Sequence, residues 1–547
     1  MKKTHINLVL LLLFFWGCSE NETTNVSLSY VKFVHKTLTI PYTGGESLLL
    51  IESCGTPWEI VYDKDNDLIS DILQTKGGEL GDVKQYTQIK FRCNENLTKD
   101  IRSQELFLIN EITGERSSFT LIQDTKYKPL LLSIDKSTEY QTIVGFGGMY
   151  NPKIWLSKND LITESEITKM YDSNQLGYNV LRLMIYPNEL DWISDIDAAK
   201  RAQELGAIIF ASPWEIPAHM SEEINVNGKL YDRHLKPDSY QEYANHLVKY
   251  IKFMKDNGVD LYAVSVQNEP DMDFTFWYPH EIVNFIKKHG NQIKEAGVKL
   301  MAPEACGFQP EYTDPVLNDA EAFDKTDILA GHTYQGFIDI EESSYVKNRY
   351  DYICSLYNKK LAASGKTWWM TEHLFNEGEK ESDSSKWEFQ KWKYNLSTLG
   401  KEIHMCMDGY CSAYIYWYLK RFYGMIGDSD NRSLEANGEV LKNGYILSHY
   451  AKYATGTIRI NINTGDLNVL GTAYLNRDNN EVSIVLINLT NDDLNVSIPL
   501  SGIKEIDAIE TTEEKNMEKA ITGELNESDG AYVLVSKSSI TSIRLNL

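Results

Sequence analysis

The chain has 547 residues, of which 42% are hydrophobic, so it is long enough for several hydrophobic cores and is not a disordered protein. Its formal net charge of −24 argues against nucleic acid and anionic membranes as partners, because a negative field repels both. An acidic substrate would therefore need a locally placed cation.

The N-terminus has the layout of an export signal. Two lysines precede an apolar run over 8–16, which is too short to span a bilayer comfortably. Gly17 directly before Cys18 resembles a bacterial lipobox, in which Cys18 is lipidated; ordinary secretion with cleavage nearby is the alternative. The acidic stretch over 19–22 is similar to that of surface lipoproteins of Bacteroidetes. We therefore expect a signal peptide over 1–18 and an outward-facing outer-membrane location, with the lipid as the membrane contact.

Residues 19–126 are expected to form a linker and a small β-sandwich. Short alternating runs, separated by turn residues about every ten positions, are typical of this architecture. Gly44-Gly45 before a strand, Trp58 after a turn and Arg102 before a strand resemble a BACON domain, an Ig-like module at the N-terminus of carbohydrate enzymes of Bacteroidetes. The resemblance implies a spacer or a sugar-binding module, and the sequence leaves both open.

From 143 to 454, apolar strands alternate with helical segments, which predicts parallel strands joined by helical crossovers. Eight strand–helix units fit a closed β/α barrel better than an open sheet, and no GxGxxG fingerprint follows the first strand. The expected strands are 143–147, 179–185, 207–212, 261–267, 299–302, 327–331, 367–371 and 413–417. The expected helices include 239–257, 281–296 and 386–402.

Short strands return after the barrel. Residues 455–547 are expected to form a side β-sandwich fused to it, joined by a strand from 127–142. The fold is thus expected to be multidomain, with an Ig-like all-β domain, an eight-stranded β/α (TIM) barrel and a side β-sandwich. The cysteines after Cys18 form no CxxC or Cys/His ligand set, so we expect no structural zinc. We also expect no cofactor.

Two glutamates follow strands of the predicted barrel. Glu269 follows the fourth strand and Glu372 the seventh, so both lie at the face where barrel enzymes carry their active sites. A retaining glycosidase needs two carboxyl groups about 5 Å apart, one as nucleophile and one as acid and then base. Asn268 beside Glu269 can hydrogen-bond a sugar 2-hydroxyl. The pair therefore predicts a glycosidase, although a single glutamate at a strand end is more often a cap or an ion-pair partner.

A family resemblance spans residues 130–547. The chain resembles glycoside hydrolase family 30 in five stretches, which are Gly145-Phe146-Gly147-Gly148, Leu181-Arg182-Leu183, Ala211-Ser212-Pro213-Trp214, Gln267-Asn268-Glu269-Pro270 and Trp369-Met370-Thr371-Glu372-His373. The resemblance implies a retaining mechanism without metal, Glu269 as acid/base and Glu372 as nucleophile. It also makes Trp214 a candidate sugar-facing aromatic, with packing as the alternative.

Within the family, further stretches resemble the xylanase branch. They are Met301-Ala302-Pro303-Glu304, Gly331-His332-Thr333-Tyr334 and 416–424, and they make Tyr334 and Trp417 candidate substrate-binding residues. In glucuronoxylanases of this branch, an Arg and a Tyr after the eighth strand hold the carboxylate of a glucuronic acid branch. The matching positions are Arg421 and Tyr423, and a guanidinium suits a carboxylate. The alternative is that Arg421 pairs with a local acid, Asp428 or Asp430.

One departure weakens this resemblance. The loop after the nucleophile offers Glu377 where such enzymes usually place Tyr and Ser, and a glutamate there would repel the group that Arg421 attracts. The expected function is that of a monomeric, endo-acting β-1,4-xylanase, with glucuronoxylan as the expected polysaccharide partner. A β-1,6-glucanase or other β-glucosidic enzyme is one alternative. A non-catalytic surface glycan-binding protein is the other.

Overall fold

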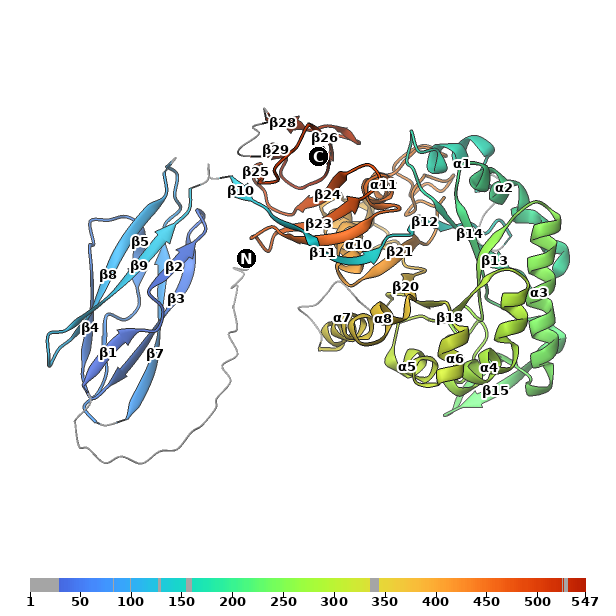
Figure 1. Cartoon of the computed structure of the whole chain (residues 1–547), viewed down its shortest axis with the longest axis horizontal. Coiled ribbons are helices and arrows are strands. Elements are labelled where there is room, and N and C mark those ends of the chain that lie inside the picture. The colour runs from blue at the N-terminus through green and yellow to red at the C-terminus, as the bar shows by residue number, and fades with distance from the viewer. Residues whose placement is uncertain are drawn as a thin grey trace. The chain divides into compact units, whose positions relative to one another are not determined.

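The computed structural model describes residues 29–547 except 82, 99, 126–128, 154–159, 335–343, 524 and 526–529. The chain forms two compact units, of which the first ends at Pro129 and the second runs from Leu130 to Leu547 (Figure 1). The expected export signal and Cys18 lie outside the described residues. No helix in the described part is long and apolar enough to cross a membrane.

The first unit consists of two β-sheets around one hydrophobic core. The sheets have the orders β1-β3-β7-β5 and β2-β9-β8-β4-β6. Their strands are β1 (Tyr30–Phe33), β2 (Thr37–Ile40), β3 (Gly45–Cys54), β4 (Trp58–Tyr62), β5 (Ile69–Ile72), β6 (Lys76–Gly77), β7 (Lys84–Cys93), β8 (Arg102–Asn110) and β9 (Arg116–Gln123). Side chains alternate between the two faces of a strand, so Ile51, Trp58 and Leu108 meet in the core and are fully buried.

The second unit contains a closed parallel barrel of eight strands, which confirms the predicted barrel. The strands, in their order around it, are β12 (Gly145–Met149), β13 (Val180–Ile185), β14 (Ile208–Pro213), β17 (Leu261–Ser265), β18 (Lys299–Ala305), β19 (Ile328–Gly331), β20 (Thr367–Met370) and β21 (Cys411–Tyr416). The barrel closes because β12 pairs with both β13 and β21. Gly147 permits a close approach there, since a Cβ on it would lie 1.7 Å from the carbonyl oxygen of Val180.

Helices lie outside the barrel strands (Figure 1). They are α1 (Glu164–Tyr171), α2 (Ile196–Glu204), α3 (Tyr240–Asp256), α4 (Pro279–Glu295), α5 (Pro310–Asn318), α6 (Ala320–Lys325), α7 (Ser344–Leu356), α8 (Ala362–Ser364), α9 (Trp392–Asn395), α10 (Lys401–Asp408) and α11 (Lys442–Ala454). The helix expected over 386–402 begins only at Trp392, and from there α9 continues through a π-helical stretch (Leu396–Gly400) into α10 without interruption. Tertiary contacts at its start account for the difference, because Phe389 packs on Phe422 and the indole of Trp392 donates to the carbonyl of Ser538 at 2.6 Å.

Two further sheets flank the barrel within the same unit. A seven-stranded sheet has the order β11-β22-β23-β24-β30-β26-β27, and a four-stranded sheet the order β10-β25-β29-β28. The strands are β10 (Leu130–Leu131), β11 (Ser133–Thr142), β22 (Ile458–Asn463), β23 (Val469–Asn476), β24 (Glu481–Asn488), β25 (Leu494–Ile498), β26 (Glu505–Thr511), β27 (Glu518–Lys519), β28 (Ile521–Thr522), β29 (Ala531–Val535) and β30 (Ser539–Asn546). Residues of both sheets, such as Ile484 and Val533, share one core. The larger sheet also packs on α11, whose buried His449 hydrogen-bonds Ser542 at 2.8 Å.

Candidate active site

Glu269 and Glu372 face each other at the mouth of the barrel. Glu269 lies just beyond β17 and Glu372 just beyond β20, and each residue is 5% exposed. A carboxylate oxygen of one lies within 4.8 Å of a carboxylate oxygen of the other. The backbone of Glu269 adopts φ +44°, an uncommon value for a residue with a side chain, and its N–H donates to the carbonyl of Glu304 at 2.9 Å. The barrel thus brings two acids from distant parts of the chain to one point.

Arg182 connects the residues of this site. It lies in β13, is fully buried, and its guanidinium donates to Glu372, to the side-chain oxygen of Asn268 (2.5 Å) and to Glu304 (3.0 Å). The indole of Trp214 lies 4.4 Å from the guanidinium carbon, which is the distance of a cation–π contact. One arginine therefore orients the nucleophile candidate, the amide beside the acid and a third carboxylate.

Glu304 and His332 add a second buried pair of charges. Glu304 is fully buried in β18; although burial would raise its pKa, Arg182 and then His332 hold that pKa at about 2. His332 follows β19 and its Nδ1 lies 2.9 Å from an oxygen of Glu269. Burial would lower its pKa, but Glu372, Glu269 and Glu304 raise it to about 9. At neutral pH the ring is therefore protonated and donates to Glu269.

The nucleophile candidate is held by two donors. Besides Arg182, the hydroxyl of Tyr334 donates to Glu372 at 3.0 Å. Burial raises the pKa of Glu372 above its usual value, while the charges of His332 and Arg182 act against this shift. Three carboxylates (Glu269, Glu304 and Glu372) thus face two cations (Arg182 and His332). One proton on a carboxyl group therefore makes the site electrically neutral.

Asn268 offers a free donor beside Glu269. Its side-chain oxygen accepts from Arg182, which fixes the amide orientation, and its Nδ2 is buried with no hydrogen-bond partner among the described residues. A buried donor without a partner costs free energy unless a ligand satisfies it. This NH₂ group is therefore placed to donate to a sugar hydroxyl.

The aromatic candidates lie against the same cluster. Trp214 follows β14 and is 1% exposed, and its ring lies 5.8 Å from that of Trp417, which follows β21 and is 8% exposed. Trp417 also hydrogen-bonds Tyr423. Trp214 is almost fully buried and packs on Arg182, so Trp417 is the more accessible of the two residues.

Arg421 and Tyr423 lie together next to this aromatic pair. The guanidinium carbon of Arg421 is 5.7 Å from the ring centre of Tyr423. Arg421 also makes an ion pair with Asp428, whose nearest oxygen is 3.7 Å from Nε, while its side chain remains 22% exposed. The local pairing considered from the sequence is therefore present, and it leaves part of the guanidinium accessible.

Glu379, two residues after Glu377, is an acid that acts on this region. Burial raises the pKa of Tyr423 to about 12; the charge of Arg421 acts against this shift, and the nearby carboxylate of Glu379 adds to it. Glu379 also lies 3.8 Å from Arg432, whereas Glu377 is exposed. The loop after the nucleophile candidate thus brings a carboxylate, that of Glu379, close to Tyr423.

One group in the described part of the chain has the spacing of metal ligands, and it is Glu269, His332 and Glu372. Two of its members are carboxylates at the spacing that a retaining glycosidase needs, so this spacing is accounted for by acid/base and nucleophilic chemistry.

Arg182, Glu304 and His332 lie within motifs of the sequence from which no role for them was predicted. All three are fully buried and link Glu269 to Glu372. A charged residue in or just after an otherwise apolar barrel strand was the available signal, because burial of a charge requires a partner.

A closed β/α barrel with two facing glutamates at the ends of β17 and β20 defines a glycoside hydrolase. The model of the glycosyl hydrolase family 30 TIM-barrel domain matches residues 154–356. The chain is 34% identical over 377 residues to glucuronoxylanase XynC of Bacillus subtilis (strain 168), covering 68% of this chain and 81% of that protein.

Solved structures agree with this match. The GH30 endoxylanase from Clostridium papyrosolvens C71 is 31% identical, with a TM-score of 0.62, and covers 76% of this chain and 100% of that one. The family 30 subfamily 8 xylanase Xyn30A from Clostridium acetobutylicum is 27% identical, with a TM-score of 0.60, and covers 76% of this chain and 99% of that one. The chain belongs to glycoside hydrolase family 30.

Proposed function

We propose that the protein is a retaining, endo-acting hydrolase of β-1,4-xylan. The observation that carries the proposal is the carboxylate pair, whose oxygens lie within 4.8 Å of each other. Retaining glycosidases keep their two carboxyl groups about 5–5.5 Å apart, whereas inverting enzymes need roughly 6.5–9.5 Å to admit a water. Similarity to a glucuronoxylanase over most of both chains supports xylan as the substrate.

In this mechanism Glu372 attacks the anomeric carbon while Glu269 protonates the leaving oxygen. Arg182 and Tyr334 hold Glu372 in place, and Arg182 disfavours its protonation. Asn268 donates its free N–H to the sugar 2-hydroxyl, a contact that strengthens as positive charge develops on the ring. Glu269 then deprotonates the water that releases the glycosyl group.

Recognition of a glucuronic acid branch is the finer part of the proposal. Arg421 and Tyr423 lie together and the guanidinium is partly exposed, which supports a carboxylate contact. Glu379 and Asp428 oppose it, because like charges weaken the attraction of a bound carboxylate. The enzyme is therefore expected to prefer glucuronoxylan moderately and still cleave undecorated xylan.

A panel of β-glycans tests the proposal. The wild type should release reducing ends from xylan and glucuronoxylan, and NMR should detect the β-anomer as the first product. Preferential release from a β-1,6-glucan would assign the alternative specificity. Binding without hydrolysis of any glycan would make the protein a glycan-binding protein.

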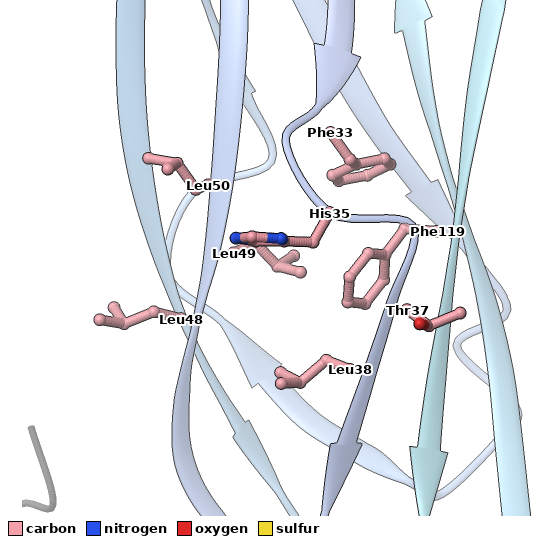
Figure 2. Close-up of a pocket in the computed structure, with 8 residues that line it drawn as sticks. All are labelled: Phe33, His35, Thr37, Leu38, Leu48, Leu49, Leu50 and Phe119. Carbon is pink, nitrogen blue, oxygen red and sulfur yellow. The ribbon is translucent and has the colours of Figure 1, made fainter. Parts of the chain in front are cut away.

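For the first unit we propose a spacer role, with lipidation at Cys18 as the anchor and the outer-membrane surface as the location. A pocket in this unit has a volume of only about 50 Å³ and is lined by the apolar side chains of Phe33, Leu49 and Phe119 among others (Figure 2). One liquid water occupies about 30 Å³, so a sugar ring does not fit.

Cys18→Ser should move the enzyme from the membrane fraction to the soluble fraction without changing kcat. A soluble wild type would contradict the anchor.

A further inference from the structure

Glu402 is a fully buried glutamate that takes no part in the proposed catalytic steps. It lies in the first turn of α10, the helix that precedes β21 in the chain and packs against it. Burying a carboxylate is costly unless hydrogen bonds or a cation compensate for the lost water. The partners of Glu402 therefore indicate what this group does.

Three side chains donate hydrogen bonds to the carboxylate of Glu402. The hydroxyl of Tyr414, in β21, donates at 2.6 Å, and that of Thr333, after β19, donates at 3.1 Å. Nδ1 of His373, after β20, lies 2.9 Å from one carboxylate oxygen and 2.7 Å from the other. Because an ionised carboxylate only accepts, the Nδ1 that faces it carries a proton. Its two oxygens offer about four acceptor positions, enough for all three donors.

Two of these partners adjoin the residues at the centre of the reaction. His373 directly follows the nucleophile candidate Glu372 in the chain. Thr333 directly precedes Tyr334, whose hydroxyl donates to Glu372 at 3.0 Å. The rings of His373 and Tyr334 also contact each other, with their centroids 4.8 Å apart. One carboxylate, that of Glu402, thus holds the neighbour of the nucleophile and the neighbour of its tyrosine donor.

The segment that carries the nucleophile needs such a contact, because it lies beyond the regular sheet. The pairing of β20 with β19 and β21 ends at Met370, two residues before Glu372. After that point the backbone N–H of Trp417 donates to the carbonyl of His373 at 2.9 Å. The bond from the His373 ring to Glu402 adds a side-chain anchor to this single backbone bond at the same residue.

We propose that Glu402 is a positioning residue that holds Glu372 in the geometry needed for attack on the sugar. It acts through His373, which adjoins the nucleophile, and through Thr333, which adjoins Tyr334. The inference rests on the proposed retaining function and deepens it, because it gives a role to a buried group outside the catalytic pair. A displacement of about 1 Å at the reacting groups can cost on the order of 10²-fold in rate.

Covalent trapping measures the attack by Glu372 directly. The probe is a 2-fluoro xylobioside with a dinitrophenolate leaving group, and its fluorine slows hydrolysis of the glycosyl-enzyme so that the adduct accumulates. A carboxylate oxygen of Glu372 forms a bond to the anomeric carbon, while the bond to the aryl oxygen breaks and dinitrophenolate leaves with the electron pair. This leaving group needs no proton, so the rate does not depend on Glu269. Mass spectrometry counts the labelled sites, and released dinitrophenolate gives the rate at each site.

Glu402→Gln should slow labelling on the order of 10-fold to 100-fold, and should lower kcat on xylan by a similar factor with little change in KM. The reason is that a glutamine offers one oxygen to three donors and directs an NH₂ group at one of them. Thr333→Val removes one donor at nearly constant shape and should act in the same direction more weakly. The matched control is Glu510→Gln in β26. Glu510 is also a buried glutamate of this unit, paired with Lys515, and its variant should be labelled as fast as the wild type.

A merely structural role would give a different result. It would lower the unfolding temperature or the number of labelled sites in Glu402→Gln and leave the rate at each labelled site unchanged, and this outcome would overturn the inference. Equal slowing in Glu510→Gln would overturn it as well. If Glu402→Gln does not fold, an unchanged labelling rate in Thr333→Val has the same consequence. A wild type that is neither labelled nor active on any β-glycan would mean that the proposed function itself has failed, which is a distinguishable result.

Discussion

The two units of the chain differ in how many charged side chains they bury. In the described part of the first unit, Glu52 is the one buried charged residue, and its partners Lys32 and Lys84 are about half exposed. At the mouth of the barrel, by contrast, Arg182 and Glu304 are both fully buried and paired with each other. Burying charges is costly unless they are paired, so a dense buried network indicates function rather than stability. The following predictions test this difference.

The largest expected effect is the loss of catalysis in the barrel. Glu269→Gln and Glu372→Gln should each lower kcat by on the order of 10⁴ or more, because general acid/base help is worth roughly 10² to 10⁴ and the nucleophile forms the intermediate. Steady-state kinetics on xylan measures this. Glu52→Gln in the first unit should leave kcat unchanged; a comparable loss there would break the distinction between the units.

The next effect is on stability. Glu304→Gln replaces the fully buried carboxylate that pairs with Arg182 by a neutral amide, so the buried charge of Arg182 is less compensated, and this should cost about 3–5 kcal/mol. Glu52→Gln should cost less than about 1 kcal/mol, since the lysines around Glu52 can turn to solvent. Calorimetry of both variants of the full chain measures the comparison. Equal shifts in unfolding temperature for the two variants would show that the buried Arg182–Glu304 pair contributes no more to stability than the half-exposed pairs of Glu52.

A smaller effect concerns the glucuronate contact. Arg421→Ala should cut kcat/KM on glucuronoxylan by roughly 10-fold to 150-fold, because a charge-assisted hydrogen bond contributes about 1.5–3 kcal/mol. Activity on undecorated xylo-oligosaccharides should barely change. Glu379→Ser should raise activity on glucuronoxylan alone, with Glu377→Ser, two residues away and exposed, as the matched control. Equal losses on both substrates for Arg421→Ala would leave only the general xylanase function.

The smallest expected effect is a shift in pH dependence. Burial raises the pKa of Glu372, and the nucleophile must be ionised, so kcat/KM should fall as pH decreases through a value above the usual 4.5. The charge of His332 lowers the pKa of Glu372; His332→Gln removes it and should move this acid limb to higher pH. His35→Gln, an exposed histidine of the first unit, should leave the profile in place. A limb that stays unmoved in His332→Gln would contradict the electrostatic coupling.

The periodicity of apolar residues and the order of strand-like and helix-like segments determined the barrel. Apolar runs alternating with helical segments require parallel strands and crossovers. This periodicity lies within short stretches of sequence, so it can be recognised without knowledge of tertiary contacts. All eight strands are in the expected order, although β18 extends to Ala305 and so includes Glu304. The helix expected over 386–402 was wrong at its start, which lies at Trp392, because the aromatic side chains there find partners elsewhere in the second unit.

Sequence also placed Glu269 and Glu372 at the same face, since parallel barrel strands all end there. Only the tertiary structure decided which charges support them. Arg182, Glu304 and His332 come from three other strands, and their pairing depends on distances that no spacing along the chain encodes. The same holds for Glu379, since a loop's path sets which carboxylate approaches Tyr423. Strand ends follow from periodicity, whereas electrostatic partners follow from the packing of the whole barrel.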